Sequence, residues 1–147
     1  KYIPDCGLSS DFMTGFCDET EEDHKLTLSL METVKYHFSY MFQYSERPNT
    51  FAQRKLKDNV PENIKKRRLQ EIIDIQQKHS LFRNKMSIDG KYRVLIEGFS
   101  KKSDEKFFGR TSENTVVVFK KNQAKIGDFV NVKIHNCTSA TLIGEII

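Results

Sequence analysis

The sequence has 147 residues, 37% hydrophobic and 30% charged, a composition that is typical of a folded chain and excludes wholesale disorder. It has no signal-peptide pattern and no apolar run near the roughly 20 residues that span a membrane, so we predict no membrane partner. The formal net charge of +4 is uneven, with net +1 over residues 1–85 and net +3 over residues 86–147. The basic second part therefore favours a polyanionic partner. Three scattered cysteines, Cys6, Cys17 and Cys137, predict a reducing, cytoplasmic location.

Residues 8–44 have the pattern of a strand, a helix and a second strand. Residues 8–14 are read as a buried strand, and residues 38–44 as another. Between them, residues 21–36 have helical periodicity, and Thr20 with Asp23 forms a capping box at the helix start. A strand, a helix and a strand in direct succession predict a βαβ unit, whose strands are parallel and whose crossover is right-handed. In parallel α/β folds, binding and catalytic residues lie at the carboxyl ends of the strands, which here are residues 15–20 and 44–50.

A long helix is predicted from Pro61 to about Lys85, because proline is tolerated at a helix start. On a helical wheel Arg68 falls inside the apolar arc, between Ile64 and Ile72. A buried arginine needs a carboxylate or phosphate partner. The alternative is that its stem packs while its guanidinium reaches water.

From Ser87 onward the hydrophobic pattern changes to period two, which indicates strands. Turn signals divide this part into five short runs: 92–97, 107–111, 115–119, 129–135 and 140–147. With no helical pattern between them, the runs predict a small five-stranded antiparallel OB-like barrel, since closure removes exposed edges. The predicted domains are therefore residues 1–85, of α/β class, and residues 86–147, of all-β class.

Cations and aromatic residues alternate in the predicted barrel. The basic residues are Lys101, Lys102, Lys106, Arg110, Lys120, Lys121 and Lys125, and the aromatic ones are Phe99, Phe107, Phe108 and Phe119. Such a surface can neutralise phosphates and stack bases, which favours RNA binding. The alternative is that the phenylalanines form the core while the lysines only keep loops soluble.

No metal site or catalytic residue is predicted from the residue spacing. The four histidines are scattered and lack the i, i+4 spacing of a zinc helix: His24, His37, His79 and His135. Cys17 precedes a helix start, but the acidic residues around it oppose thiolate formation, so we expect it to fill space.

Three stretches, in this order, resemble the radical S-adenosylmethionine methylthiotransferases: SSDFMTGFCDETEED, YSERPNTFA and VPENIKKRRL, at residues 9–23, 44–52 and 60–69. The tail from about Met86 is similar to the TRAM domain, the RNA-binding module that ends these enzymes. Within the family, GRTSENTVVVF at residues 109–119 resembles the MiaB-type branch, which adds a methylthio group to isopentenyladenosine beside the tRNA anticodon. Asn49 replaces a family glycine but tolerates a left-handed turn.

The resemblance implies a carboxyl-terminal segment: part of a TIM-like radical barrel, a joining helix and a TRAM barrel. It places the cysteines of two 4Fe–4S clusters upstream of Lys1, so the whole enzyme would use these clusters and S-adenosylmethionine. We expect this segment alone to bind no cofactor and to be inactive. The implied cofactor-side residues are Asp11, Gly15 and Arg47, with Arg68 near the cofactor or substrate and structural ion pairing as the alternative role.

The implied partner is the tRNA anticodon arm, bound through Lys101, Lys102, Lys106, Arg110, Lys120 and Lys121. Without barrel neighbours, strands 8–14 and 38–44 would expose apolar faces and edges, and we expect them to pair between chains. The competing interpretation is a stand-alone TRAM or OB-like RNA-binding module without enzymatic activity.

Overall fold

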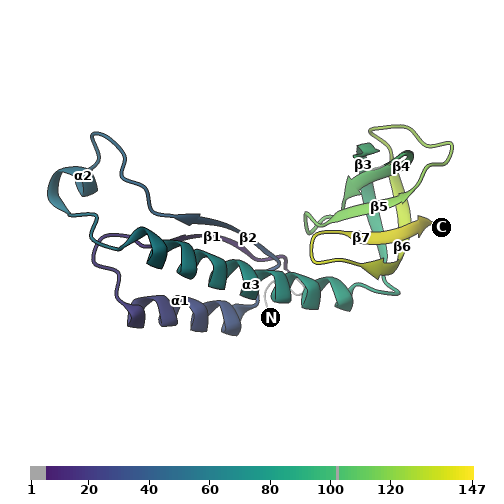
Figure 1. Ribbon diagram of the computed structural model, residues 1–147. Coiled ribbons are helices and arrows are strands. Elements are labelled where there is room, and N and C mark those ends of the chain that lie inside the picture. Colours follow the sequence, from purple (N-terminus) through teal and green to yellow (C-terminus); the bar gives the residue numbers. More distant parts are fainter. Residues whose placement is uncertain (1–5, 102) are drawn as a thin grey trace. The chain divides into compact units, whose positions relative to one another are not determined.

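The computed structural model describes residues 6–101 and 103–147, which divide into two compact units (Figure 1). The first unit is Leu8–His79, and the second is Ser80–Ile147 with the two described residues before Leu8. In the described part of the chain, no helix combines the length and the apolar character needed to cross a membrane. Lys102, one of the predicted RNA contacts, lies outside the described residues.

The first unit is built on a parallel strand pair. Its elements are β1 (Ser9–Thr14), α1 (Glu21–Val34), β2 (Phe38–Gln43), α2 (Phe51–Lys55) and most of α3 (Glu62–Met86). Strands β1 and β2 pair in parallel from Ser9 opposite Phe38 to Thr14 opposite Gln43, which confirms the predicted βαβ unit. The capping box is confirmed too: the Asp23 amide donates to the Thr20 hydroxyl at 3.1 Å, and the Thr20 amide donates to the Asp23 carboxylate at 2.9 Å.

Helices α1 and α3 cover one face of the strand pair (Figure 1). The core of this unit joins Phe12 of β1, Met31 of α1 and Ile72 of α3. The prediction that residues 8–14 are buried throughout was wrong, because β1 alternates: Phe12 is buried while Met13 is 51% exposed. Helices pack against one face only, so the residues that point to the other face stay exposed.

The loop after β2 contains a short helix that was not predicted. At its start the Thr50 hydroxyl accepts a hydrogen bond from the Gln53 amide at 3.2 Å. The Thr-x-x-Gln spacing of a capping box was the available signal. Asn49, just before it, has φ of 67°, so the expected left-handed turn is confirmed.

The second unit contains a closed five-stranded barrel. Its strands are β3 (Lys91–Ser100), β4 (Ser103–Arg110), β5 (Val116–Lys120), β6 (Phe129–Cys137) and β7 (Leu142–Ile146). Their order around the barrel is β3-β4-β5-β7-β6, with β6 returning to β3. The core consists of inward residues from every strand: Val94, Ile96, Phe107, Val117, Phe119, Val132, Ile134 and Leu142.

The barrel is mixed, so the prediction of a purely antiparallel sheet was wrong. Strands β5 and β7 pair in parallel, with Val118 opposite Ile143, while the other four pairs are antiparallel. Strand direction cannot alternate around a closed ring with an odd number of members. Five strands that close must therefore include a parallel pair, and closure itself is as predicted.

Candidate functional site

The carboxyl ends of β1 and β2 lie together, as expected for a parallel pair, and Lys65 of α3 fills the space beside them. The Tyr44 amide donates to the Thr14 carbonyl at 2.7 Å. Lys65 is buried, and its ammonium donates to both carboxylate oxygens of Asp58 at 2.6 Å. Gly15 has φ of 74°, and a Cβ there would collide with the Lys65 side chain. The glycine is thus required both by its backbone conformation and by the close approach of Lys65.

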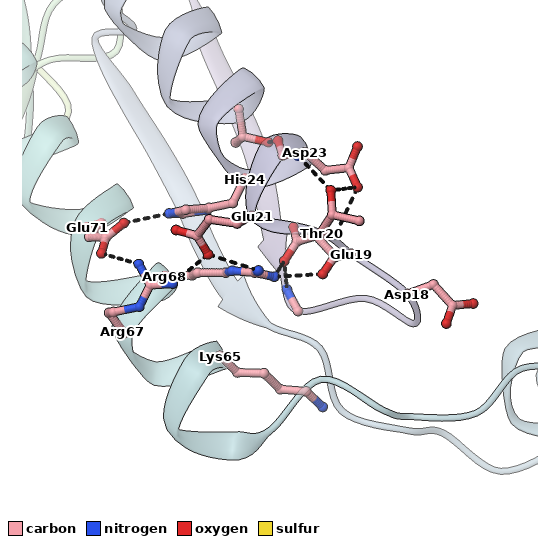
Figure 2. Close-up of polar contacts among 12 residues, drawn as sticks. Asp18, Glu19, Thr20, Glu21, Asp23, His24, Lys65, Arg67, Arg68 and Glu71 are labelled. Atoms are coloured by element: carbon pink, nitrogen blue, oxygen red, sulfur yellow. Dashed lines mark hydrogen bonds and ion pairs between the residues drawn. The ribbon is translucent and has the colours of Figure 1, made fainter.

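Arg68 lies next to this turn and is anchored by carboxylates (Figure 2). Its side chain is 5% exposed, and its Nη1 donates to Glu19 Oε2 at 2.6 Å and to the Glu19 carbonyl at 3.0 Å. Its Nη2 donates to Glu21 at 3.1 Å. Glu19 in turn accepts from the Gly15 amide at 2.6 Å. The prediction that a buried Arg68 has a carboxylate partner is therefore confirmed, and its guanidinium does not reach into water.

The ion-pair network continues along α1 and α3. Arg67 donates to Glu21 and to Glu71, each at 2.7 Å, and His24 Nε2 lies 2.7 Å from Glu71 Oε2 (Figure 2). Hydrogen bonds from Arg67 and Arg68 lower the pKa of Glu21 from 4.5 to about 2. Burial alone would raise the pKa of Glu71, but hydrogen bonds from His24 and Arg67 outweigh it and lower that pKa. These opposed charges fasten the start of α1 to α3.

A cavity of about 320 Å³ opens beside this network and is lined by Asp18, Glu19, Glu21, Asn59, Val60, Pro61, Ile64 and Arg68. Asp18, at φ of 64°, exchanges hydrogen bonds with Asn59 across 2.6 and 2.9 Å. Since Arg68 also forms ion pairs with both Glu19 and Glu21, most polar groups that line the cavity have partners within the unit.

The three predicted cofactor-side residues occupy different environments. Gly15 is buried at the strand end, as described above. Asp11 is exposed in the middle of β1, opposite Tyr40. Arg47 is exposed in the loop after β2, where its carbonyl accepts from the Thr50 hydroxyl at 2.8 Å. Lys65, which the sequence analysis did not single out, is the cation that the fold brings closest to Gly15; its spacing from Arg68 and Ile72 along α3 was the missed signal.

On the barrel, four predicted RNA-binding lysines are exposed: Lys101, Lys106, Lys120 and Lys121. Lys106 of β4 is directly opposite Lys120 of β5 in the strand register. Among the described residues none of the four forms an ion pair with a carboxylate. Like charges facing each other across a strand pair are unfavourable unless an anion lies between them.

The phenylalanines near these lysines divide into two groups. Phe107 and Phe119 are each 1% exposed and belong to the barrel core. Phe99 is 45% exposed, although it pairs with Phe107 in register and their ring centroids are 5.4 Å apart. The Lys121 ammonium is 4.9 Å from the Phe99 ring centroid. The core interpretation thus holds for Phe107 and Phe119, but not for Phe99.

Arg110 differs from the lysines because its guanidinium has protein partners. It donates to Glu97 at 3.2 Å and to the Asn114 side chain at 3.0 Å. Asn114 has φ of 63° in the turn between β4 and β5, and the Thr111 amide donates to the Thr115 carbonyl across that turn at 3.0 Å. Part of the GRTSENTVVVF motif therefore shapes this turn.

The described residues do not fit an iron–sulfur cluster, which is normally held by four cysteine thiolates. Cys17 is buried in the unit Leu8–His79, whereas Cys6 and Cys137 belong to the other unit. Within residues 6–101 and 103–147, His, Cys, Asp and Glu side chains form no group of three or more that could hold a metal ion.

Comparisons with known proteins give matches to one domain family and to full-length relatives. Residues 90–147, which include all five barrel strands, match the family model of the TRAM domain. Over nearly its whole length the chain is also similar to proteins named tRNA-2-methylthio-N(6)-dimethylallyladenosine synthase. It is 63% identical to that of Christiangramia forsetii over 145 residues, which are 99% of this chain and 30% of the relative.

Two further relatives with the same name give the same picture. The chain is 61% identical over 142 residues to the Amoebophilus asiaticus protein, covering 97% of this chain and 29% of the relative. It is 54% identical over 145 residues to the Bacteroides thetaiotaomicron protein, covering 99% and 32%. The chain thus spans about 30% of the length of these relatives, and the family resemblance found in the motifs is confirmed.

Proposed function

We propose that the barrel of this chain binds tRNA at the anticodon arm. The observation that carries the proposal is a set of exposed lysines that have no carboxylate partner within the described part of the chain: Lys101, Lys106, Lys120 and Lys121. In OB-like barrels, the second and third strands and the loop between the first two bind oligonucleotides. Lys106 and Lys120 lie on β4 and β5, and Lys101 lies between β3 and β4, which is that arrangement. Lys102 and Arg110 complete the proposed surface, and in Arg110 the guanidinium also supports the neighbouring turn.

We propose further that the chain is the carboxyl-terminal part of an enzyme that adds a methylthio group to isopentenyladenosine beside the anticodon, in the cytoplasm. The support is the 54–63% identity to proteins named tRNA-2-methylthio-N(6)-dimethylallyladenosine synthase. This identity extends through the unit Leu8–His79 as well as the TRAM domain. The whole enzyme would use S-adenosylmethionine and two 4Fe–4S clusters. Together these would supply the chemistry that removes hydrogen from a C–H bond and inserts sulfur at that carbon. This chain supplies RNA binding and part of the barrel wall.

In this proposal, residues 1–85 belong to the radical barrel and its connecting helix, and residues 86–147 to the TRAM domain. The parallel pairing of β1 with β2 suits a parallel barrel. The face of β1 and β2 away from the helices exposes Met13, Tyr40 and Phe42, at 51%, 62% and 55%, which suits the predicted self-association of the isolated chain. Asp11, Gly15 and Arg47 remain the proposed cofactor-side residues.

The test is to express the complete reading frame that encodes this chain in a bacterium lacking its own synthase. Mass spectrometry of tRNA nucleosides should then show the 2-methylthio form of isopentenyladenosine. Changing Lys106 and Lys120 to alanine should lower the modified fraction at limiting enzyme. In the family that the chain resembles, a CxxxCxxC motif holds the radical cluster. A reading frame that encodes no such motif and yields no modified nucleoside would instead identify a stand-alone RNA-binding module.

A further inference from the structure

We propose that Phe99 is a stacking platform for one unpaired base of the bound RNA, with Lys121 contacting the adjoining phosphate. This inference rests on the proposed RNA-binding function and specifies which form of RNA the surface selects. An exposed aromatic ring beside a cation serves unpaired nucleotides, because the bases of a duplex already stack on one another.

The position of Phe99 follows from the strand register. Phe99, Phe107 and Phe119 are register partners on three adjacent strands, with ring centroids 5.4 and 6.3 Å apart. Register partners project to the same side of a sheet, so all three rings belong to the interior side. Phe107 and Phe119 are buried in the core, whereas Phe99 is last in the row and 45% exposed. The core thereby fixes the orientation of an aromatic ring that reaches solvent at one end of the barrel.

The ammonium group of Lys121 lies beside this ring. The Lys121 ammonium is 4.9 Å from the Phe99 ring centroid and 5.9 Å from that of Phe107, and the Lys121 amide donates to the Glu105 carbonyl at 2.9 Å. Lys101 follows Phe99 by two positions, in the loop between β3 and β4. Among the described residues neither lysine has a carboxylate partner. A phosphate is the anion that a base on Phe99 would bring with it.

The experiment uses the 147-residue chain and RNA stem-loops that carry the fluorescent base 2-aminopurine in the loop, with a blunt-ended RNA duplex as the second probe. Stacking should quench 2-aminopurine on binding. Phe99→Leu keeps an apolar side chain at the end of the core but removes the aromatic face. It should abolish the quench and weaken stem-loop binding about tenfold or more, with duplex binding unchanged. Phe99→Tyr should retain both the quench and the affinity.

Phe129→Leu is the matched control, since Phe129 is 56% exposed on the same barrel, with Arg93 4.2 Å from its ring centroid, but is not a register partner of Phe107. It should leave binding and quench unchanged. If Phe99→Leu binds and quenches like the parent chain while Lys106→Ala/Lys120→Ala loses affinity, the stacking proposal is wrong and RNA binding stands. If the parent chain binds neither probe, the proposed function itself fails.

Discussion

Two groups of cations in this chain have opposite surroundings, one in the unit Leu8–His79 and the other on the barrel. In the unit Leu8–His79, Lys65, Arg67 and Arg68 each contact a carboxylate at 2.6 or 2.7 Å. On the barrel, Lys106 and Lys120 face one another in register, and among the described residues neither has an acidic partner. Removing one partner of a buried ion pair leaves the other charge uncompensated and destabilises the fold. Two cations side by side repel each other and form a surface suited to a bound anion. The comparison therefore separates structural charges from the charges proposed to bind RNA.

The largest expected effect is that of Arg68→Ala. Removing the guanidinium leaves Glu19, whose side chain is 13% exposed, without its cation. Breaking a buried pair in this way costs about 3 kcal/mol of unfolding free energy. Urea denaturation followed by circular dichroism measures it. Lys66→Ala is the control, because Lys66 is 69% exposed and 3.7 Å from Glu62, and it should cost less than about 0.5 kcal/mol. Equal losses in the two variants would contradict the assigned role of Arg68.

The next largest effect is expected from Gly15→Ala. Gly15 combines a φ of 74° with the close approach of Lys65, whereas Gly127 has φ of 96° and an added Cβ there would meet nothing within 4 Å. Backbone strain costs about 1 kcal/mol at either position, and the clash with Lys65 adds about 1 to 2 kcal/mol at Gly15 alone. The same denaturation measurement on Gly127→Ala isolates the strain. A Gly15→Ala variant no less stable than Gly127→Ala would show that Lys65 does not fill this space.

A smaller effect of opposite sign is expected on the barrel. Changing Lys106 and Lys120 to alanine removes two like charges in direct register, so the free protein should gain up to about 0.5 kcal/mol of stability at low salt. Thermal unfolding at low and high salt measures the gain and its screening. A clear loss of stability would mean that these lysines have structural partners after all.

The smallest effect is a pH dependence centred on Glu21. Its pKa is lowered from 4.5 to about 2 by hydrogen bonds from Arg67 and Arg68, so its contribution to stability is complete above pH 4.5 and is lost as pH falls toward 2. Glu21→Gln should therefore flatten the decline of the denaturation midpoint over this range. Glu22→Gln, at the exposed neighbouring position, should leave the decline as it is. Identical profiles for the two variants would count against the Arg67–Glu21–Arg68 arrangement.

Much of this architecture follows from local sequence signals. The capping box of Thr20, the parallel strands and the left-handed Asn49 are all set within a few residues or by one short crossover. Even the parallel pair in the barrel was implicit in an odd number of strands. The prediction of an antiparallel sheet was wrong because five strands that close into a ring cannot all pair antiparallel.

The partners of the buried cations depend on tertiary structure instead. The wheel position of Arg68 required an anion, but its partner Glu19 lies 49 residues earlier in the chain. Lys65 pairs with Asp58 in a loop that has no periodic pattern. Likewise, the row from Phe119 to Phe99 exists only because three strands share one register, so sequence pattern alone could not separate the exposed ring from the buried ones.

The most direct test of the account is the salt dependence of RNA binding in two double variants with equal loss of charge. Lys106→Ala/Lys120→Ala removes two cations from the barrel, and Lys66→Ala/Arg67→Ala removes two from α3. For a tRNA stem-loop, the slope of log K against log salt should fall in magnitude by about 1.5 in the barrel variant. It should stay at the parent value in the α3 variant. Equal changes in both would mean that RNA responds to net charge, and would contradict a binding surface on the barrel.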